Sequence, residues 1–435
     1  MQDRAATTST ASAAPGLALM LLALTPFSLG YFLSYLFRAT NAVVAPDLVR
    51  DVGLTASQLG LLTAAYLLAF SAFQLPLGIL LDRYGPRRVQ AALVAVGGIG
   101  ALIFGFGQSA TALLIGRAII GLGFSGGLMC AFKAVVIWVP EPRRPLANAL
   151  IMAVGALGLI VATTPLEFAV QAVGWRYVFF GVAVFTFVVA ALIFMIVPER
   201  SGPAPANRRL TEEIRALGAI AKDPVFRALA PLLGIATGAH VAIQTLWAGP
   251  WFRDVAGLDR AGVAHELFLM AIAFLVGILF TGAIADRLTR RGVSLLHIML
   301  AVLAVFLAVQ VAIVLEIAKD QLWIWLLFGM TGQVGVLAFP WLGSYFGAAL
   351  SARANSAVNL PMFGFAFLFQ FAIGAVIDRF PLTAAAGYQP EAYQWAFGAV
   401  LLAEALALLW YLLNWHHLAK ADAVVRAAYQ ARARK

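Results

Sequence analysis

Twelve long apolar stretches separated by short polar segments constrain this chain more than any other feature of its sequence. In the first half they cover residues 17–43, 56–81, 88–107, 110–138, 146–171 and 176–197. In the second half they cover residues 227–252, 262–285, 293–317, 321–350, 354–378 and 391–414. A helix needs about 20 apolar residues to cross the hydrocarbon core of a bilayer, so each stretch is long enough to span it. The sequence therefore predicts an all-α membrane protein with twelve transmembrane helices.

The composition excludes most other classes of protein. Of the 435 residues, 62% are hydrophobic and 11% are charged, whereas soluble domains have roughly a quarter of their residues charged. A transmembrane β-barrel is excluded because its strands would alternate apolar and polar residues. A disordered chain and a nucleic-acid-binding domain are excluded as well. Cys130 is the single cysteine, so no intrachain disulfide can form.

The positions of the basic residues predict the orientation of the chain in the lipid bilayer. With both termini inside, 21 of the 30 Lys and Arg residues lie in cytoplasmic segments, 6 in outer loops and 3 within the apolar stretches. Basic residues are retained on the cytoplasmic side, so we expect both termini there. The polar start, Met1 to Pro15, lacks the basic region and cleavage site of a signal peptide, and we expect residues 1–16 to form a cytoplasmic tail.

The longest polar segment, Pro198 to Arg227, divides the apolar stretches six and six. We therefore expect an N-terminal six-helix bundle over 17–197, a cytoplasmic linker over 198–226, a C-terminal six-helix bundle over 227–414 and a cytoplasmic tail over 415–435. Arg outnumbers Lys 25 to 5 and Ala is abundant, which is typical of GC-rich bacterial genomes. We expect a monomer in a bacterial inner membrane.

One short motif occurs once in each half, between the second and third apolar stretches and between the eighth and ninth. The first copy holds Gly78, Asp82, Arg83, Gly85, Arg87 and Arg88, and the second holds Gly282, Asp286, Arg287, Arg290 and Arg291. Glycine lets two helices approach closely, and an aspartate can accept hydrogen bonds from the start of a helix in the neighbouring bundle. Repeated halves are typical of secondary transporters, although two basic loops would also satisfy the charge rule.

On these motifs the chain resembles the major facilitator superfamily, whose best-known signature is a Gly-x-Leu-x-Asp-Arg-x-Gly-x-Arg-Arg loop. The resemblance covers residues 17–414. It implies two six-helix bundles around a central cavity that opens alternately to either side of the membrane, and a conformational role for both copies of the motif. It does not name the substrate.

The first apolar stretch has a polar and aromatic stripe with one cation. Its members lie at steps of three or four residues and therefore share one helix face: Tyr31, Tyr35, Arg38 and Asn41. A guanidinium stays charged and offers planar donors suited to a carboxylate or a phosphate. We predict that this face lines a cavity for an anion. In the alternative interpretation, the helix ends near residue 40 and Arg38 reaches the outer headgroups.

The first stretch also resembles the first helix of the glycerol-3-phosphate and hexose-phosphate antiporters, and of the related anion:cation symporters for organic acids. The resemblance rests on Tyr31, Tyr35, Arg38, Pro46 and Leu48. It implies that Arg38 binds the substrate. In the phosphate antiporters an arginine of the seventh helix shares this role, but here the seventh stretch has no arginine before Arg253. A single cation favours a monoanion such as a small carboxylate.

Three residues are candidates for proton coupling. His240 can titrate near neutral pH, and Glu167 is a carboxyl group that can take up a proton within the membrane. Arg117, followed by Gly121 and Gly123, resembles the fourth-helix motif of proton-coupled members of the superfamily. The alternatives are a neutral, hydrogen-bonded histidine, a solvent-exposed glutamate and an arginine that only ties helices together.

Further polar and aromatic residues are candidates for the cavity wall: Gln244, Trp247, Gln333, Tyr345, Asn355 and Asn359. Each of them is equally suited to hydrogen bonds between helices. The sequence has no nucleotide-binding loop or zinc-protease motif, and its five histidines form no readable metal cluster. We expect no enzymatic activity, no cofactor and no metal.

The sequence thus predicts a secondary active transporter for a small organic anion. Proton symport is favoured over exchange, because a lone anion enters against a membrane potential that costs about 2.3 kcal/mol per charge per 100 mV. A proton-driven exporter of drugs or metabolites is the alternative, although only Gly155, Gly158 and Pro165 match the fifth-helix motif of such exporters. A transport-inactive sensor would need a signalling domain that the short linker and tail do not supply.

Overall fold

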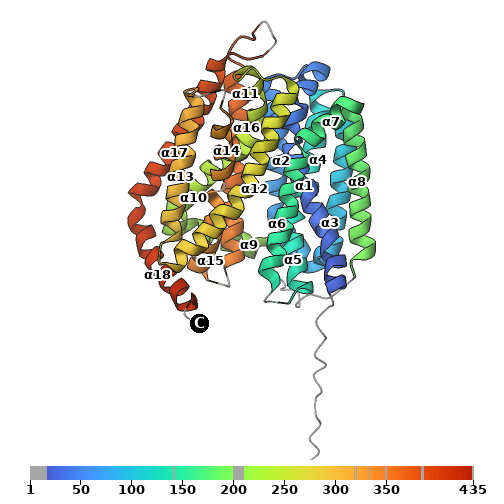
Figure 1. Cartoon of the computed structure of the whole chain (residues 1–435). Helices are drawn as coiled ribbons and strands as arrows, with labels where there is room; N and C mark the ends of the chain where they lie inside the picture. The colour runs from blue at the N-terminus through green and yellow to red at the C-terminus, as the bar shows by residue number, and fades with distance from the viewer. Residues whose placement is uncertain are drawn as a thin grey trace, which may run out of the picture.

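The computed structural model describes residues 17–140, 143–198, 210–317, 319, 321–332, 334–347, 350–383 and 387–433. Nearly all of these residues are helical, and the described ranges contain no strand beyond one isolated bridge between Leu382 and Tyr388. The long helices run side by side in one direction through the molecule (Figure 1). The expected all-α architecture is confirmed.

Eight α-helices make up the first half of the chain. They are α1 (Leu17–Val52), α2 (Ala56–Ala72), α3 (Gln74–Phe106), α4 (Ala110–Phe124), α5 (Gly127–Trp138), α6 (Arg144–Val161), α7 (Thr164–Val173) and α8 (Trp175–Ile196). Helix α9 (Leu210–Lys222) lies between the halves.

The second half begins with α10 (Pro224–Ala242), the π-helix η2 (Ile243–Trp247), α11 (Ala248–Asp254), α12 (Arg260–Arg290) and α13 (Leu295–Val314). It continues with α14 (Leu322–Thr331), the 3₁₀ helix η3 (Val334–Leu337), α15 (Ala338–Phe346), α16 (Ser351–Ile377) and α17 (Pro390–Leu413). Helix α18 (Trp415–Ala433) follows at the end of the chain.

Ten helical segments of the described chain are long and apolar enough to cross a membrane. The bent pair α6 and α7, which meet at 44°, makes an eleventh span if it is counted as one. Helix α2 is apolar but has 17 residues. The chain is thus a multi-pass membrane protein, and each of the twelve predicted stretches contains a helix, although length and composition alone do not establish twelve full spans.

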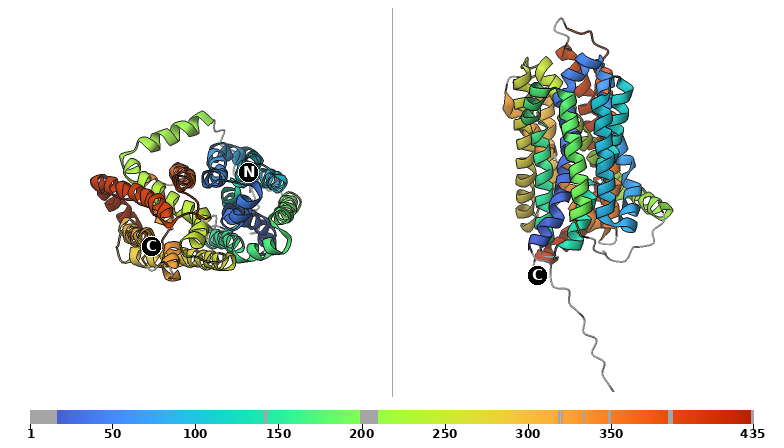
Figure 2. Two further views of the ribbon diagram at one scale, coloured as in Figure 1. Left: turned by 90° about the horizontal axis from the view of Figure 1, so that it is seen from above. Right: turned by 90° about the vertical axis from the view of Figure 1, so that its right-hand side faces the viewer.

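Seen from above, the helices of the first half (blue to green) and those of the second half (yellow-green to red) form two groups side by side (Figure 2). Helix α9 lies at the edge, between the two groups. We call the side where α1 begins and α18 ends the inner side, and the opposite side the outer side. The positions of the basic residues predict that the inner side faces the cytoplasm.

The first copy of the repeated motif is not the loop that the sequence predicts. Helix α3 starts at Gln74 and runs through the motif, with a kink at Gly85, whose φ of 74° favours glycine. In the second half α12 likewise continues to Arg290, and the chain turns at Gly292. The second copy therefore lies at a helix end, whereas the first spans a kink within α3. The break in the preceding span falls earlier, between α2 and α3 at Phe73.

Candidate functional site

A cavity of about 160 Å³ lies between the two halves. The first half contributes Tyr31, Tyr35, Arg38, Phe70, Gln74, Ser125, Leu128, Met129 and Met152 to its wall. The second half contributes Thr237, Val241, Ile278, Gly335, Val336, Phe339, Asn359, Met362 and Phe363. Most of these side chains are apolar, and Arg38 is the one charged residue among the described residues of the wall.

Arg38 lies in an aromatic cage within this cavity. Its guanidinium carbon is 4.7 Å from the ring centroid of Tyr35, 5.3 Å from that of Phe70 and 5.5 Å from that of Phe363. The side chain is largely buried, and its Nε has no hydrogen-bond partner within the described chain. Aromatic faces stabilise a cation without neutralising it, so the positive charge remains available to an anion.

The alternative interpretation of Arg38, as a headgroup contact at the end of a helix, does not fit this geometry. Helix α1 continues fourteen residues beyond Arg38, to Val52, so that Arg38 lies inside the helix. Tyr31 and Tyr35 share its face as predicted, and their rings pack edge to face with centroids 5.2 Å apart. A methyl group on Gly155 would lie 2.5 Å from the Tyr31 ring, so this glycine lets α6 pack against the tyrosine.

The fourth member of the predicted stripe, Asn41, is buried outside the cavity wall. Its Nδ2 donates a hydrogen bond of 2.7 Å to Oγ1 of Thr63 and links α1 to α2. In this state of the molecule Asn41 therefore holds two helices of the first half together.

His240 does not reach the cavity either. The imidazole is completely buried between the rings of Phe274, Phe306 and Phe328, whose centroids lie 5.7, 6.0 and 5.2 Å away. Neither ring nitrogen has a hydrogen-bond partner within the described chain, so the expected hydrogen-bonded histidine is not what the structure has. A Cβ on Gly332 would lie 1.7 Å from the His240 Cδ2, so α14 must end in glycine here. The structure separates His240 from Arg38, and its role in coupling stays a prediction.

Gln244 and Trp247 belong to the π-helix η2 and lie outside the cavity wall. Trp247 Nε1 donates to the Gln370 carbonyl at 3.1 Å, and Gln370 Nε2 donates to Thr245 Oγ1 at 2.9 Å. These bonds tie η2 to α16. Gln244 Nε2 is buried with no partner within the described chain. π-Helical turns occur frequently at functional sites, because they leave a backbone group free of the regular ladder.

The remaining candidates for the cavity wall are dispersed. Asn359 lines the cavity as predicted, whereas the neighbouring Asn355 does not. The Tyr345 hydroxyl donates to Asp223 at 3.4 Å, next to the start of α10 on the inner side. Gln333 lies outside the described residues.

Arg117 is fully buried in α4 and does not line the cavity. Its Nη1 donates a hydrogen bond of 2.7 Å to the carbonyl of Phe37, the residue before Arg38. Its guanidinium carbon also lies 5.3 Å from the ring centroid of Tyr66. This geometry ties α4 to α1 directly behind the cage of Arg38, and a coupling role for Arg117 stays a prediction.

Glu167 belongs to an ion-pair cluster on the outer side. Arg260, at the start of α12, donates to Glu167 of α7 and to both carboxylate oxygens of Asp47 in α1, at 3.0 and 2.5 Å. Both carboxylates are almost completely buried, with 4% of each side chain exposed. Glu167 is therefore not the solvent-exposed residue of the alternative interpretation. The cluster joins the two halves and closes the outer side.

A second contact closes the outer side next to this cluster. The Asp378 carboxylate, just after α16, accepts hydrogen bonds from the backbone N–H groups of Ala56 and Ser57 at 2.9 and 2.8 Å. Burial raises the pKa of Asp378, but hydrogen bonds to the charged form, from the Ser57 side chain and from the backbone N–H groups of Ser57 and Ala56, outweigh it and hold the pKa below its usual value. Gly60 and Gly374 allow the backbones of α2 and α16 to touch along this interface.

In the first copy of the repeated motif, Asp82 pairs with Lys133 of α5 at 2.6 Å, within the first half. Arg87 donates to the Phe194 carbonyl, and the Arg83 guanidinium lies 5.2 Å from the Tyr84 ring centroid. No neighbour lies within 4 Å of a Cβ built on Gly78, so this glycine is not at a close helix contact in this state.

The second copy of the motif is more exposed. Arg290 pairs with Asp286 one turn earlier in α12, and both side chains are more than half exposed. Arg287 and Arg291 are exposed, as is Arg88 of the first copy. Gly282, like Gly78, has no neighbour within 4 Å of a built Cβ.

Sequence reasoning missed Asp47, Arg260 and Asp378 as parts of the site. The sequence carries one signal for Asp47 and Arg260: they are opposite charges at the outer ends of the first and eighth apolar stretches. Nothing in the sequence pairs Asp378 with the start of α2.

Comparison with curated proteins gives several transporters. The chain is 27% identical over 277 residues to the probable sulfoacetate transporter SauU of Cupriavidus necator, covering 60% of this chain and 64% of that protein. It is 24% identical over 287 residues to the D-galactonate transporter of Escherichia coli, covering 60% and 66%. With the putative tartrate transporter of Agrobacterium vitis it shares 24% over 192 residues, covering 42% of each chain. The matches thus span less than two thirds of these relatives.

Solved structures of low sequence identity share the fold. A bacterial homologue of the human lysosomal transporter Spinster, in an inward-facing and occupied conformation, superposes with a TM-score of 0.73 at 16% identity, covering 92% of this chain and 97% of that chain. The D-xylose–proton symporter gives 0.68 at 14% identity, covering 90% and 97%. The sequence profile of the Major Facilitator Superfamily matches residues 27–363. Since this match covers well over half of the chain, the protein belongs to the Major Facilitator Superfamily of membrane transporters and is not an enzyme.

Proposed function

We propose that this protein is a secondary active transporter that carries a small organic monoanion across a bacterial inner membrane by alternating access. The observation that carries the proposal is Arg38, the one charged residue among the described residues of the central cavity, held between three aromatic rings. A cation in this position attracts an anion and disfavours cationic drugs. The names of the relatives, which include sulfoacetate, D-galactonate and tartrate, support an organic anion.

The chemistry of the wall narrows the substrate class. The planar guanidinium of Arg38 suits a carboxylate or a sulfonate, and the hydroxyls of Tyr31 and Tyr35 lie on the same helix face to orient it. From the second half, Thr237 and Asn359 supply uncharged polar groups. The rest of the wall consists largely of Met, Phe, Leu, Val and Ile side chains. An acid with a short or apolar tail fits this wall, because many hydroxyl groups would be buried there without partners.

The coupling ion is proposed to be the proton, since uptake of a lone anion works against the membrane potential. Glu167, His240 and Arg117 are the candidates for this step. None of them lines the central cavity, so in this proposal the proton binds apart from the substrate. An imposed pH gradient should then accelerate uptake into proteoliposomes, and equal rates with and without the gradient would favour exchange.

The central test is uptake of radiolabelled short carboxylates and sulfonates by proteoliposomes that contain wild-type protein or the Arg38→Lys variant. Loss of the planar, charge-assisted contact is worth about 1.5–3 kcal/mol, so we expect uptake at low substrate concentration to fall roughly 10- to 100-fold. Arg176→Lys is the matched control, because Arg176 pairs with Asp51 on the outer surface of the first half. Wild-type uptake by a monodisperse Arg38→Lys protein would overturn the proposal.

A further inference from the structure

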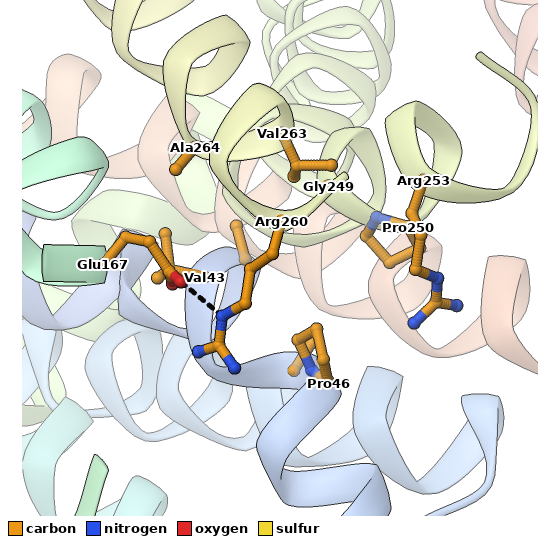
Figure 3. A pocket seen from close by; sticks show the side chains of 11 residues that line it. Val43, Pro46, Glu167, Gly249, Pro250, Arg253, Arg260, Val263 and Ala264 are labelled. Carbon is orange, nitrogen blue, oxygen red and sulfur yellow. Dashed lines mark hydrogen bonds and ion pairs between the residues drawn. The ribbon is translucent and has the colours of Figure 1, made fainter. Parts of the chain in front are cut away.

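A second pocket, of about 110 Å³, lies on the outer side around the Arg260 cluster (Figure 3). Both halves of the protein line it: α1 contributes Ala42, Val43, Ala45 and Pro46, α7 contributes Glu167, and α11 and α12 contribute Gly249, Pro250, Arg253, Arg260, Val263 and Ala264. The positively charged residues of the pocket belong to one half of the protein and the negatively charged residues to the other. Both arginines belong to the second half, whereas Glu167, with Asp47 beside it, belongs to the first.

The outer pocket lies on the direct route from outside to Arg38. Residues 42–46 of α1 line the outer pocket, and Arg38 on the same helix lines the central cavity. With a rise of 1.5 Å per residue, the two compartments begin about 6 Å apart along α1. The backbones of α1 and α11 are in close contact there, since a Cβ on Gly249 would lie 2.7 Å from the Ala42 carbonyl oxygen. In the proposed transport cycle, an anion from outside therefore meets the outer pocket before the central cavity.

In the present closed state, two carboxylates of the protein itself bind the Arg260 guanidinium. Its guanidinium binds Glu167 through Nε and Asp47 through both Nη atoms. When the outer side opens, the halves separate and Arg260 must leave both partners. Glu167 then still accepts the hydrogen bond of 2.8 Å from the Gln171 side-chain amide. Asp47 still has its ion pair with Arg50, at 3.0 Å. Arg260 has no such second partner in the described pocket.

Water already reaches the two arginines, with 31% of the Arg260 side chain and 37% of the Arg253 side chain exposed. The Arg260 guanidinium is partly exposed whereas its partners Glu167 and Asp47 are buried, so an external carboxylate can approach the guanidinium from the water side and compensate its charge when an internal carboxylate leaves. A ligand shifts a conformational equilibrium only if it binds one state better than the other. An anion meets that condition here, because Arg260 is free of Glu167 and Asp47 in the open state.

We propose that the outer pocket is a second anion site, in which a carboxylate or sulfonate arriving from outside takes the place of Glu167 on Arg260 and thereby favours opening of the outer side. The site rests on the proposed transport of organic anions and adds a step before the substrate reaches Arg38. It explains why Arg260 of the second half meets a carboxylate of the first half in this pocket, whereas Arg253, which also lines the pocket, is paired with Asp254 of its own half (Figure 3).

The test measures how fast a cysteine in the outer pocket reacts with a membrane-impermeant thiol reagent added from outside. Val263→Cys supplies a half-buried probe in the pocket, and Cys130→Ser removes the single native cysteine. Methanesulfonate is the anion, and methanesulfonamide at equal ionic strength is the neutral control. We expect methanesulfonate to raise the labelling rate severalfold and methanesulfonamide to leave it unchanged. Glu167→Gln should raise the rate without any added anion.

Three further variants locate the effect. Arg260→Gln should abolish the response to methanesulfonate, whereas the control Arg176→Gln should keep it. Arg38→Lys should also keep it, because the outer site is separate from the central cavity. The proposal fails if methanesulfonate has no effect although Glu167→Gln raises labelling, or if the response survives Arg260→Gln and disappears in Arg38→Lys. Failure of the transport proposal is a different result, namely no uptake of any acid by proteoliposomes.

Discussion

Asp378 of the second half caps a helix of the first half, with its Oδ2 accepting the backbone N–H of Ser57 at 2.8 Å across the interface between the bundles. An aspartate at a helix N-terminus satisfies backbone donors and meets the positive end of the helix dipole. Here the cap and the helix belong to parts that alternating access must separate. The contact therefore contributes to the closed outer side rather than to the stability of either bundle.

We predict that Asp378→Asn opens the outer side more often. Asparagine keeps one acceptor oxygen but loses the second hydrogen bond and the negative charge at the helix N-terminus, which is worth up to about 1 kcal/mol and corresponds to at most roughly a fivefold change in the ratio of open to closed molecules. Labelling of Val263→Cys from outside would report this as a faster reaction. Asp51→Asn is the matched control, since Asp51 pairs with Arg50 and Arg176 within the first half. An unchanged labelling rate in Asp378→Asn would contradict the role of the cap.

The same contact should not respond to physiological changes of pH. The pKa of Asp378 lies below its ordinary value of 3.8, so its bonds to α2 are fully present above that value and are lost only as the pH falls through the lowered pKa. All labelling rates fall with pH because the thiolate is the reacting form, but we expect the ratio of the Asp378→Asn rate to the rate with native Asp378 to stay constant from about pH 8 to about pH 5. A ratio that approaches one across this window would show that Asp378 takes up a proton there.

Gly332 should be intolerant of any side chain. A Cβ at this position would lie 1.7 Å from His240, in a core that aromatic rings fill on the other sides. Overpacking of this kind costs about 1–3 kcal/mol, so Gly332→Ala should lower the apparent melting temperature in detergent. Gly364→Ala, with open space around its Cβ, is the control and should melt like wild type. Adding His240→Ala to Gly332→Ala should restore part of the loss; no restoration would mean that another contact is responsible.

The pair of Lys133 and Asp82 should favour the present conformation on the inner side. Both side chains are about a quarter to a third exposed, so the pair is worth at most about 1 kcal/mol. Lys133→Gln removes this pair. Asp82 is then free to cap a helix of the other bundle, which is the role that the repeated motif predicts for it. We expect the fraction of outward-facing molecules to increase up to about fivefold. Faster labelling of Val263→Cys would show this. Arg176→Gln is the control, because Arg176 pairs with Asp51 within the first half, and slower labelling in Lys133→Gln would contradict the assignment.

The sequence predicted what depends on periodicity within one helix. Tyr31, Tyr35 and Arg38 share a face because of their spacing alone, and the structure places all three in the wall of the central cavity. The twelve apolar stretches and the family followed from composition and from one repeated motif. These properties are local, so one segment of chain contains all the information that they need.

The contacts between the bundles could not be predicted in the same way. Arg260 and Asp47 are 213 residues apart, and their pairing depends on which helices face each other and in which conformation. His240 is a second example. The sequence identifies a titratable side chain, but it does not show that three phenylalanines, from α12, α13 and α14, surround that side chain. Residues of this kind need tertiary packing before a role can be assigned.

The docking of α18 matters for anyone who handles this protein. Asp422 is buried and accepts hydrogen bonds from Ser294 at the start of α13 and from Trp341 in α15. Helix α15 also carries Phe339, a wall residue of the central cavity. Helix α18 therefore supports α13 and α15 on the inner side. We expect a bulky reporter fused directly behind α18 to disturb these contacts. Fluorescent or affinity tags belong at the other end of the polypeptide, ahead of Leu17, or behind a long spacer.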